Sequence, residues 1–116
     1  PELWRNDGGF GASAVLWEWV VDLVSGTVAE RQLDDRAVEF PRIDERLTGR
    51  RHRYGYSVAG ALQVGDSIVY KYDFDSRRQA SRSFGPGKGL SEFVFVPSGP
   101  DASGDHGVLM GYVYDG

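Results

Sequence analysis

The sequence predicts an all-β fold that forms part of a seven-bladed β-propeller. Two stretches resemble each other at a spacing of just over fifty residues, so that Asp22 aligns with Asp73 and Glu39-Phe40 with Glu92-Phe93. A repeat of this length, read as four short strands per unit, is typical of propeller blades. No segment shows the 3.6-residue apolar period of a helix over a useful length.

The predicted strands are bounded by glycine-containing or charged turns, and several alternate apolar and polar residues. The first hairpin covers residues 15–33, with its turn at Gly26. Residues 38–40 are expected to form a short strand that Pro41 ends, because proline cannot donate to a ladder. Further strands are expected at residues 52–59, 67–73, 78–84, 91–96 and 108–114.

The segments between these strands are expected to be irregular, because they are rich in charge, glycine or proline. They comprise a loop at residues 1–13, a charged and solvated surface loop at 42–51, a turn at 60–66, a flexible crossing at 85–89 and a loop at 97–107.

The strands group into blades when they are read from the inner strand outwards. Residues 15–33 form the outer half of one blade, residues 38–84 a full blade, and residues 91–115 the inner half of the next. About two repeats leave apolar surface uncovered, where at least about three are expected for stability. The sequence therefore predicts a fragment of a larger ring, and the remainder of the propeller is its first expected partner.

Composition excludes several classes of function. The 116 residues carry a net charge of −4 with interspersed signs, so no basic stripe for nucleic acid is present. There are no cysteines, which excludes disulfides and thiolate metal sites. No run approaches the roughly 18 apolar residues that a transmembrane helix needs, and we expect a cytoplasmic, β-rich polypeptide.

Glu39 and Glu92 are the candidate functional residues because they occupy equivalent positions in the two repeats. Equivalent residues of successive blades stand around one central axis. The repeat therefore predicts two carboxylates that point toward the same place.

Several motifs together resemble one enzyme family. The most specific is Glu39-Phe40-Pro41-Arg42-Ile43-Asp44, and it is accompanied by residues 17–23, 49–56, 69–73, 84–87, 91–97 and 107–115. These motifs resemble the carotenoid cleavage oxygenases, the family that includes lignostilbene dioxygenases and the retinal-epithelium isomerase. The resemblance covers nearly the whole chain.

The resemblance implies a seven-bladed enzyme with a ferrous ion on the propeller axis, held by four histidines. Three glutamates of the family accept hydrogen bonds from three of those imidazoles, and Glu39 and Glu92 match two of the three motifs. Such a carboxylate fixes the tautomer of the imidazole and raises its basicity. None of the four histidine motifs lies in this chain, so no metal ligand is expected in it.

The reaction implied by the resemblance is cleavage of a conjugated alkene by dioxygen to two carbonyl compounds. The implied substrate is an apolar polyene or stilbene-type molecule, such as a carotenoid, an apocarotenoid or a stilbene. Fe(II) is the implied cofactor of the complete enzyme. The chain alone is expected to be inactive.

The remaining candidates are interpreted as structural. His52 is expected to be structural and His106 to be exposed in a loop. Phe93 stands where the family often has proline, and Phe40 and Phe93 adjoin the glutamates without being assigned to a substrate tunnel. The aromatic residues of the strands are interpreted as packing between blades.

One alternative function stays open at the level of the sequence. The chain is also compatible with a non-catalytic β-propeller binding module that completes its ring by oligomerisation, because propellers host many unrelated functions. Histidine motifs in flanking sequence favour the oxygenase, and a stable oligomer of this chain favours the module.

Overall fold

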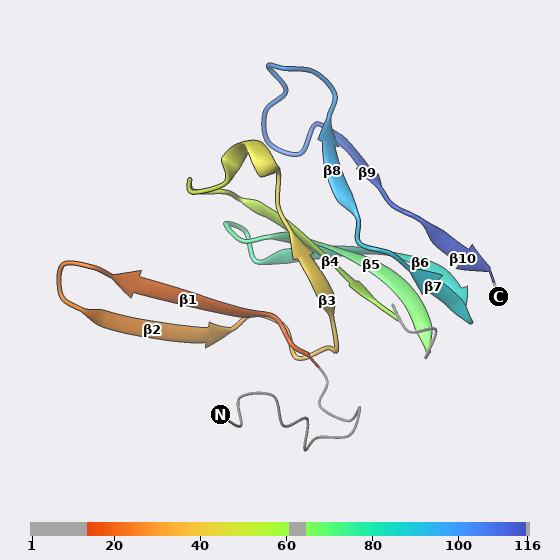
Figure 1. Ribbon diagram of the computed structural model, residues 1–116, viewed down its shortest axis with the longest axis horizontal. Helices are drawn as coiled ribbons and strands as arrows, with labels where there is room; N and C mark the ends of the chain where they lie inside the picture. The colour runs from red at the N-terminus through yellow and green to blue at the C-terminus, as the bar shows by residue number, and fades with distance from the viewer. Residues whose placement is uncertain (1–13, 61–64, 116) are drawn as a thin grey trace, which may run out of the picture. The chain divides into compact units, whose positions relative to one another are not determined.

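The computed structural model describes residues 14–60 and 65–115. The chain divides into two compact units, residues 1–37 and residues 38–116. In the described residues, all regular elements are β-strands except one short 3₁₀ helix (Figure 1). The prediction of an all-β chain is therefore confirmed. The loop expected at residues 1–13, and residues 61–64 of the turn expected at 60–66, lie outside the described residues.

The described part of the first unit is centred on a β-hairpin. Strands β1 (Trp17–Asp22) and β2 (Thr27–Gln32) pair antiparallel in continuous register. The Asp22 carboxylate accepts hydrogen bonds from the backbone N–H groups of Val24 and Ser25, at 2.8 and 3.2 Å. Gly26 then takes a positive φ of 69° that lets the chain return. The side chains of Leu23 and Val24 at the tip are 90% and 99% exposed.

The second unit contains a four-stranded antiparallel sheet in the order β3-β4-β5-β6 (Figure 1). Its strands are β3 (Glu39–Arg42), β4 (Tyr54–Ala59), β5 (Asp66–Asp73) and β6 (Arg78–Pro86). Strand β4 is buried at four consecutive positions, which shows that both faces of the sheet are covered there. A buried hydrogen bond of 2.9 Å joins the hydroxyl groups of Ser57 and Tyr72.

Two smaller pairs of strands follow this sheet. Strand β8 (Val94–Pro97) pairs with β9 (Gly107–Met110), and β7 (Lys88–Leu90) pairs with β10 (Val113–Asp115). The expected flexible crossing at residues 85–89 is therefore wrong. Its first residues extend β6, and its last residues lie in β7, where backbone pairing with β10 orders them.

The core of the second unit lies between the four-stranded sheet and the segment that follows it. Val58 and Val69 from the sheet pack with Leu90 and Phe93, and all four side chains are buried. Burial of side chains of this size contributes roughly 1.5–3 kcal/mol each. This cluster holds the chain around Phe93 against the end of β4 and the middle of β5.

Strand β3 does not end at Pro41, and that prediction is wrong. Glu39 is opposite Val58 and Arg42 is opposite Tyr56. Between these two pairs, β3 has two residues and β4 has one. The extra residue makes a β-bulge, with Phe40 at a positive φ of 52°. A bulge is one of the few places where a sheet accepts proline, because the ladder is already interrupted there.

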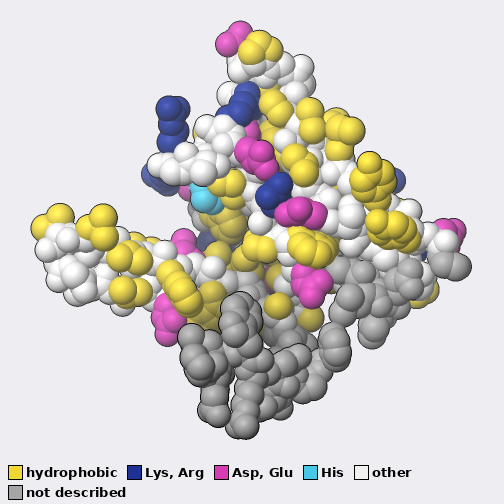
Figure 2. Space-filling view, in the orientation of Figure 1, with side chains coloured by type: hydrophobic (Ala, Val, Ile, Leu, Met, Phe, Trp, Pro, Cys, Tyr) yellow, Lys and Arg dark blue, Asp and Glu magenta, His cyan; other side chains and the backbone are white. Residues whose placement is uncertain are grey.

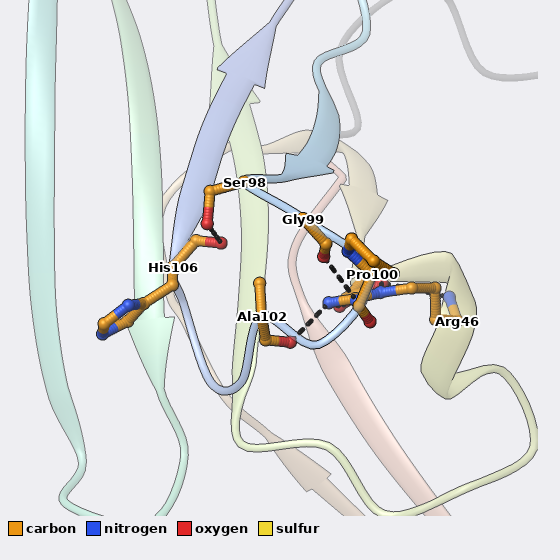
Figure 3. Close-up of polar contacts among 7 residues, drawn as sticks. Arg46, Ser98, Gly99, Pro100, Ala102 and His106 are labelled. Carbon is orange, nitrogen blue, oxygen red and sulfur yellow. Dashed lines mark hydrogen bonds and ion pairs between the residues drawn. The ribbon is translucent and has the colours of Figure 1, made fainter.

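The charged segment 42–51 is also more structured than predicted. Asp44 is only 7% exposed and caps the 3₁₀ helix η1 (Glu45–Leu47), accepting a hydrogen bond from the backbone N–H of Arg46. The Arg46 guanidinium donates to the same carboxylate and to the backbone carbonyls of Gly99, Pro100 and Ala102 (Figure 3). This arginine ties the segment to the loop at residues 98–106 instead of lying free in solvent.

No membrane-spanning helix occurs in residues 14–60 and 65–115, where no helix is both long and apolar enough to cross a bilayer.

Candidate functional site

Glu39 is the first residue of strand β3, and it lies in the short strand that the sequence predicts at residues 38–40. It is half-buried, and its backbone is opposite Val58 of the core cluster. Within the described residues, no hydrogen bond or ion pair engages its side chain. Its carboxylate is thus an available acceptor beside the core of the second unit.

Glu92 does not lie on a strand, which corrects the prediction that residues 91–96 form one. Strand β8 begins only at Val94, and residues 91–93 are irregular. The physical reason is that Phe93 turns into the core at 8% exposure, while the Ser91 hydroxyl bonds to the backbone of Tyr112 and Glu92. The Glu92 side chain, 45% exposed, is left beside this anchor.

The same core cluster positions both glutamates. Glu39 is paired with Val58, and Glu92 directly precedes Phe93, and Val58 and Phe93 belong to one packed group. The two repeats nevertheless differ in detail, because Phe40 is 42% exposed in a bulge and Phe93 is buried. That Glu39 and Glu92 share one axial site stays a prediction.

Arg42 is a residue of this region that the sequence did not single out. Its Nη2 donates to Glu45 Oε1 at 2.7 Å, and its Nε lies 3.3 Å from Glu92 Oε1. The Nε atom is buried and has no hydrogen-bond partner of good geometry in the described residues. The only signal in the sequence was its place three residues after Glu39, inside the most specific motif.

An open groove runs between the four-stranded sheet and the β8–β9 hairpin. Its volume is about 1010 Å³, and its lining includes Tyr56, Val69, Phe84, Glu92 and Phe93. Hydrophobic side chains gather over β8, β9 and β10 on the face shown in Figure 2. The exposed ones in this region are Val96, Val108, Met110, Tyr112, Val113 and Tyr114.

At one end of the groove, charged groups surround two tyrosines. Lys71 bonds to Asp105, and its Nζ lies 4.8 Å from the centre of the Tyr54 ring. Tyr56 stacks on Phe95 with ring centres 5.7 Å apart, and burial, aided by the nearby Asp105, raises the pKa of Tyr56 to about 12. The hydrogen bond from Lys71 in turn lowers the pKa of Asp105. These groups tie β4, β5 and the loop before β9 together.

The histidines occupy the kinds of place that were predicted for them. His52 is half-buried, with its ring 5.9 Å from Phe74 in an edge-on arrangement. His106 is exposed in the loop before β9, and its carbonyl accepts a hydrogen bond from Ser98 (Figure 3). Among the described residues, no group of three or more His, Cys, Asp or Glu side chains is arranged to hold a metal ion.

Solved structures similar to this chain define its class. Cobalt-substituted apocarotenoid oxygenase from Synechocystis matches with a TM-score of 0.75 and 30% identity, over 87% of this chain and 22% of that one. A mutant of the same oxygenase matches with a TM-score of 0.77 and 29% identity over the same shares. The chain is therefore a segment of a seven-bladed β-propeller.

The sequence comparisons identify the family. The model of the retinal pigment epithelial membrane protein family matches residues 4–116. A carotenoid cleavage oxygenase of Mycobacterium tuberculosis is 36% identical over 115 residues, which cover 93% of this chain and 23% of that protein. Apocarotenoid-15,15'-oxygenase of Synechocystis is 30% identical over 102 residues, 85% of this chain and 21% of the relative. The chain belongs to the retinal pigment epithelial membrane protein family, and the resemblance to carotenoid cleavage oxygenases is confirmed.

The match covers only part of each relative. The chain spans between a fifth and a quarter of the length of these curated proteins. Activity, cofactor and substrate are properties of the whole ring, of which this chain is one part.

Proposed function

We propose that this chain is part of a non-haem Fe(II) dioxygenase that cleaves a conjugated double bond of a carotenoid, apocarotenoid or stilbene. The observation that carries the proposal is the family match over residues 4–116, which includes both glutamate motifs. Matching relatives bear the names carotenoid cleavage oxygenase and, in Pisum sativum, carotenoid 9,10(9',10')-cleavage dioxygenase 1.

Within that enzyme, Glu39 and Glu92 accept hydrogen bonds from the N–H groups of histidines that lie outside this chain. The half-buried Glu39 has an unengaged carboxylate, as an acceptor for an imidazole N–H requires. Each carboxylate fixes the tautomer of its imidazole and raises its basicity.

When bound, Fe(II) held by imidazoles supplies open coordination positions for dioxygen and an electron-rich substrate. The residues of this chain contribute the support around that centre. Phe93 and Val58 are buried in the core cluster, and they adjoin the backbone positions of Glu92 and Glu39 respectively. The strand pairing of β3 and β4 fixes the backbone of Glu39, and the packing of Phe93 fixes that of Glu92.

The test uses the full-length protein to which this segment is assigned. We expect Glu39→Gln and Glu92→Gln to keep the fold and to lower Fe(II) affinity or turnover by about 10–100-fold, as loss of a ligand's hydrogen-bond partner typically does. Glu30→Gln is the matched control, because Glu30 is an exposed glutamate on the β1–β2 hairpin.

Two results would contradict the proposal in different ways. Unchanged iron affinity and turnover in both glutamate variants would remove their assignment. A full-length protein that binds no iron and cleaves no polyene would instead favour the non-catalytic propeller module.

A further inference from the structure

The bulge in β3 places Glu39 and Arg42 on the same face of the sheet. Residues three apart on a regular strand point to opposite faces, because side chains alternate. Here Glu39 is opposite Val58 and Arg42 is opposite Tyr56, and these two partners are two residues apart on β4. Directly opposed residues of antiparallel strands share a face. The extra residue in the bulge therefore brings Arg42 to the side on which Glu39 lies.

Arg42 holds two carboxylates with one guanidinium. Its Nη2 donates to Glu45 at 2.7 Å, which fixes the far end of the side chain. Its Nε faces Glu92 Oε1 at 3.3 Å, within ion-pair reach. This Nε is buried and lacks a hydrogen bond of good geometry among the described residues, although buried donors are nearly always paired. Glu92 Oε1 is the carboxylate oxygen that lies within ion-pair reach of this donor.

We propose that Arg42 is a positioning residue for Glu92. Arg42 engages Oε1 and leaves Oε2 to accept the N–H of an iron-bound imidazole. Glu45 binds the Arg42 guanidinium at Nη2. The bulge at Phe40 and Pro41 places the Arg42 side chain on the same face of the sheet as Glu39. This inference rests on the proposed function, because it assigns a role to Arg42 only through Glu92.

The experiment titrates the metal-free full-length protein with Co(II) and records affinity and the visible absorption spectrum. We expect Arg42→Met to weaken Co(II) binding by about 3–10-fold and to shift the absorption spectrum. This loss of affinity is smaller than the loss of about 10–100-fold that we expect on removing Glu92 itself. In a Glu92→Ala background, Arg42→Met has no further effect, because the carboxylate through which Arg42 acts is gone.

Two further variants separate positioning from folding. Arg42→Lys keeps the charge and much of the length of the side chain but loses the two-armed guanidinium, so we expect an intermediate Co(II) affinity in a folded protein. Arg53→Met is the control, because Arg53 pairs with Asp73 on β5, and in the described part of the chain no hydrogen bond or ion pair joins it to Glu92. We expect it to leave Co(II) affinity and the spectrum unchanged.

The outcomes distinguish this inference from the proposed function. If Glu92→Ala changes Co(II) binding and neither Arg42 variant does, the role of Arg42 is overturned and the proposed function stands. If the effects of Arg42→Met and Glu92→Ala add, Arg42 does not act through Glu92, and the inference fails. If neither Glu39→Gln nor Glu92→Ala changes Co(II) binding, the proposed function fails.

Discussion

Arg77 occupies in the β5–β6 turn the same left-handed backbone position that Gly26 occupies in the β1–β2 turn. The φ angles are 56° and 69°. Both turns begin with an aspartate whose carboxylate accepts hydrogen bonds from the N–H groups two and three residues later, Asp22 in one and Asp73 in the other. The internal repeat of the sequence is therefore repeated in the backbone of its turns.

This equivalence predicts that Arg77→Gly stabilises the protein. A side chain in the left-handed region costs about 1–2 kcal/mol, and glycine avoids that cost. The greater freedom of glycine in the unfolded chain offsets part of the gain. We expect the free energy of unfolding in urea to rise by about 0.5–1 kcal/mol.

The reciprocal variant Gly26→Arg serves as the matched control. An added Cβ at Gly26 meets no atom within 4 Å, so its effect isolates the backbone conformation. We expect a loss of about 1 kcal/mol. Equal stability of all three proteins would show that the turns relax without strain.

The hairpins were predictable because their signals are local. Gly26 and the alternation of side chains lie within a few residues of the structures that they specify. The same holds for Asp73, which matches Asp22 in the repeat. Turn residues and the alternation of side chains are properties of short segments, so they can be recognised without knowledge of the rest of the fold.

The details of the candidate site were less predictable because tertiary packing decides them. Pro41 predicted the end of a strand, whereas pairing with β4 carries the strand through a bulge. Phe93 left the expected strand because it joins the core with Val58, thirty-five residues earlier in the sequence. The contact of Arg42 with Glu92 likewise joins distant segments. No local pattern in the sequence encodes such contacts.

Asp73 predicts a loss of stability in acid. Arg53 donates to its carboxylate from Nε at 2.8 Å and from Nη2 at 2.6 Å, and these bonds hold the pKa of Asp73 well below its ordinary value of 3.8. A carboxylate with a lowered folded-state pKa stabilises the fold above its unfolded pKa and loses that contribution as the pH falls. We expect the free energy of unfolding to decrease below about pH 4.

Asp73→Asn tests this dependence. The variant is expected to be less stable than the wild type at neutral pH and to show a weaker decline of stability in acid. Asp22→Asn is the control, because hydrogen bonds from Ser25 and Val24 lower the pKa of Asp22, and no arginine pairs with it among the residues that the structure describes. Its effect on the acid dependence should be smaller. Acid profiles of Asp73→Asn and wild type that run parallel would refute the assignment.

Tyr56 predicts a second loss of stability, in alkali. Burial raises its pKa from 10.0 to about 12, with a further contribution from Asp105. A group that stays protonated longer in the folded state stabilises it less as the pH rises, so the loss occurs between about pH 10 and pH 12. Phenolate absorbance should show a late-titrating phase, and Tyr56→Phe should reduce this phase.

Tyr112→Phe controls for the loss of a hydroxyl group as such, because the Tyr112 side chain is 76% exposed. It should leave the late phase in place. If Tyr56→Phe leaves the late phase unchanged, another tyrosine carries it, and the alkaline loss of stability is not due to Tyr56.

The hydrogen bonds of Arg46 predict that this one side chain orders the loop at residues 98–106. It donates to the carbonyls of Pro100 and Ala102 at 3.1 Å each, while Asp44 holds the guanidinium in place. Arg46→Lys keeps the charge but cannot reach several carbonyls at once. We expect hydrogen exchange and proteolytic cleavage in the loop to become about 5–10-fold faster, as the loss of such bonds favours local opening.

Arg50→Lys is the matched control, because Arg50 is exposed in the same charged segment and its backbone N–H bonds only to Leu47 within the described residues. The exchange of strands β4 and β5 provides an internal reference, since their pairing does not depend on Arg46. Faster exchange in the strands as well as the loop would indicate global destabilisation. Equal hydrogen exchange of the loop in the wild type and both variants would mean that the loop is ordered by its own backbone and that the contacts of Arg46 do not stabilise it.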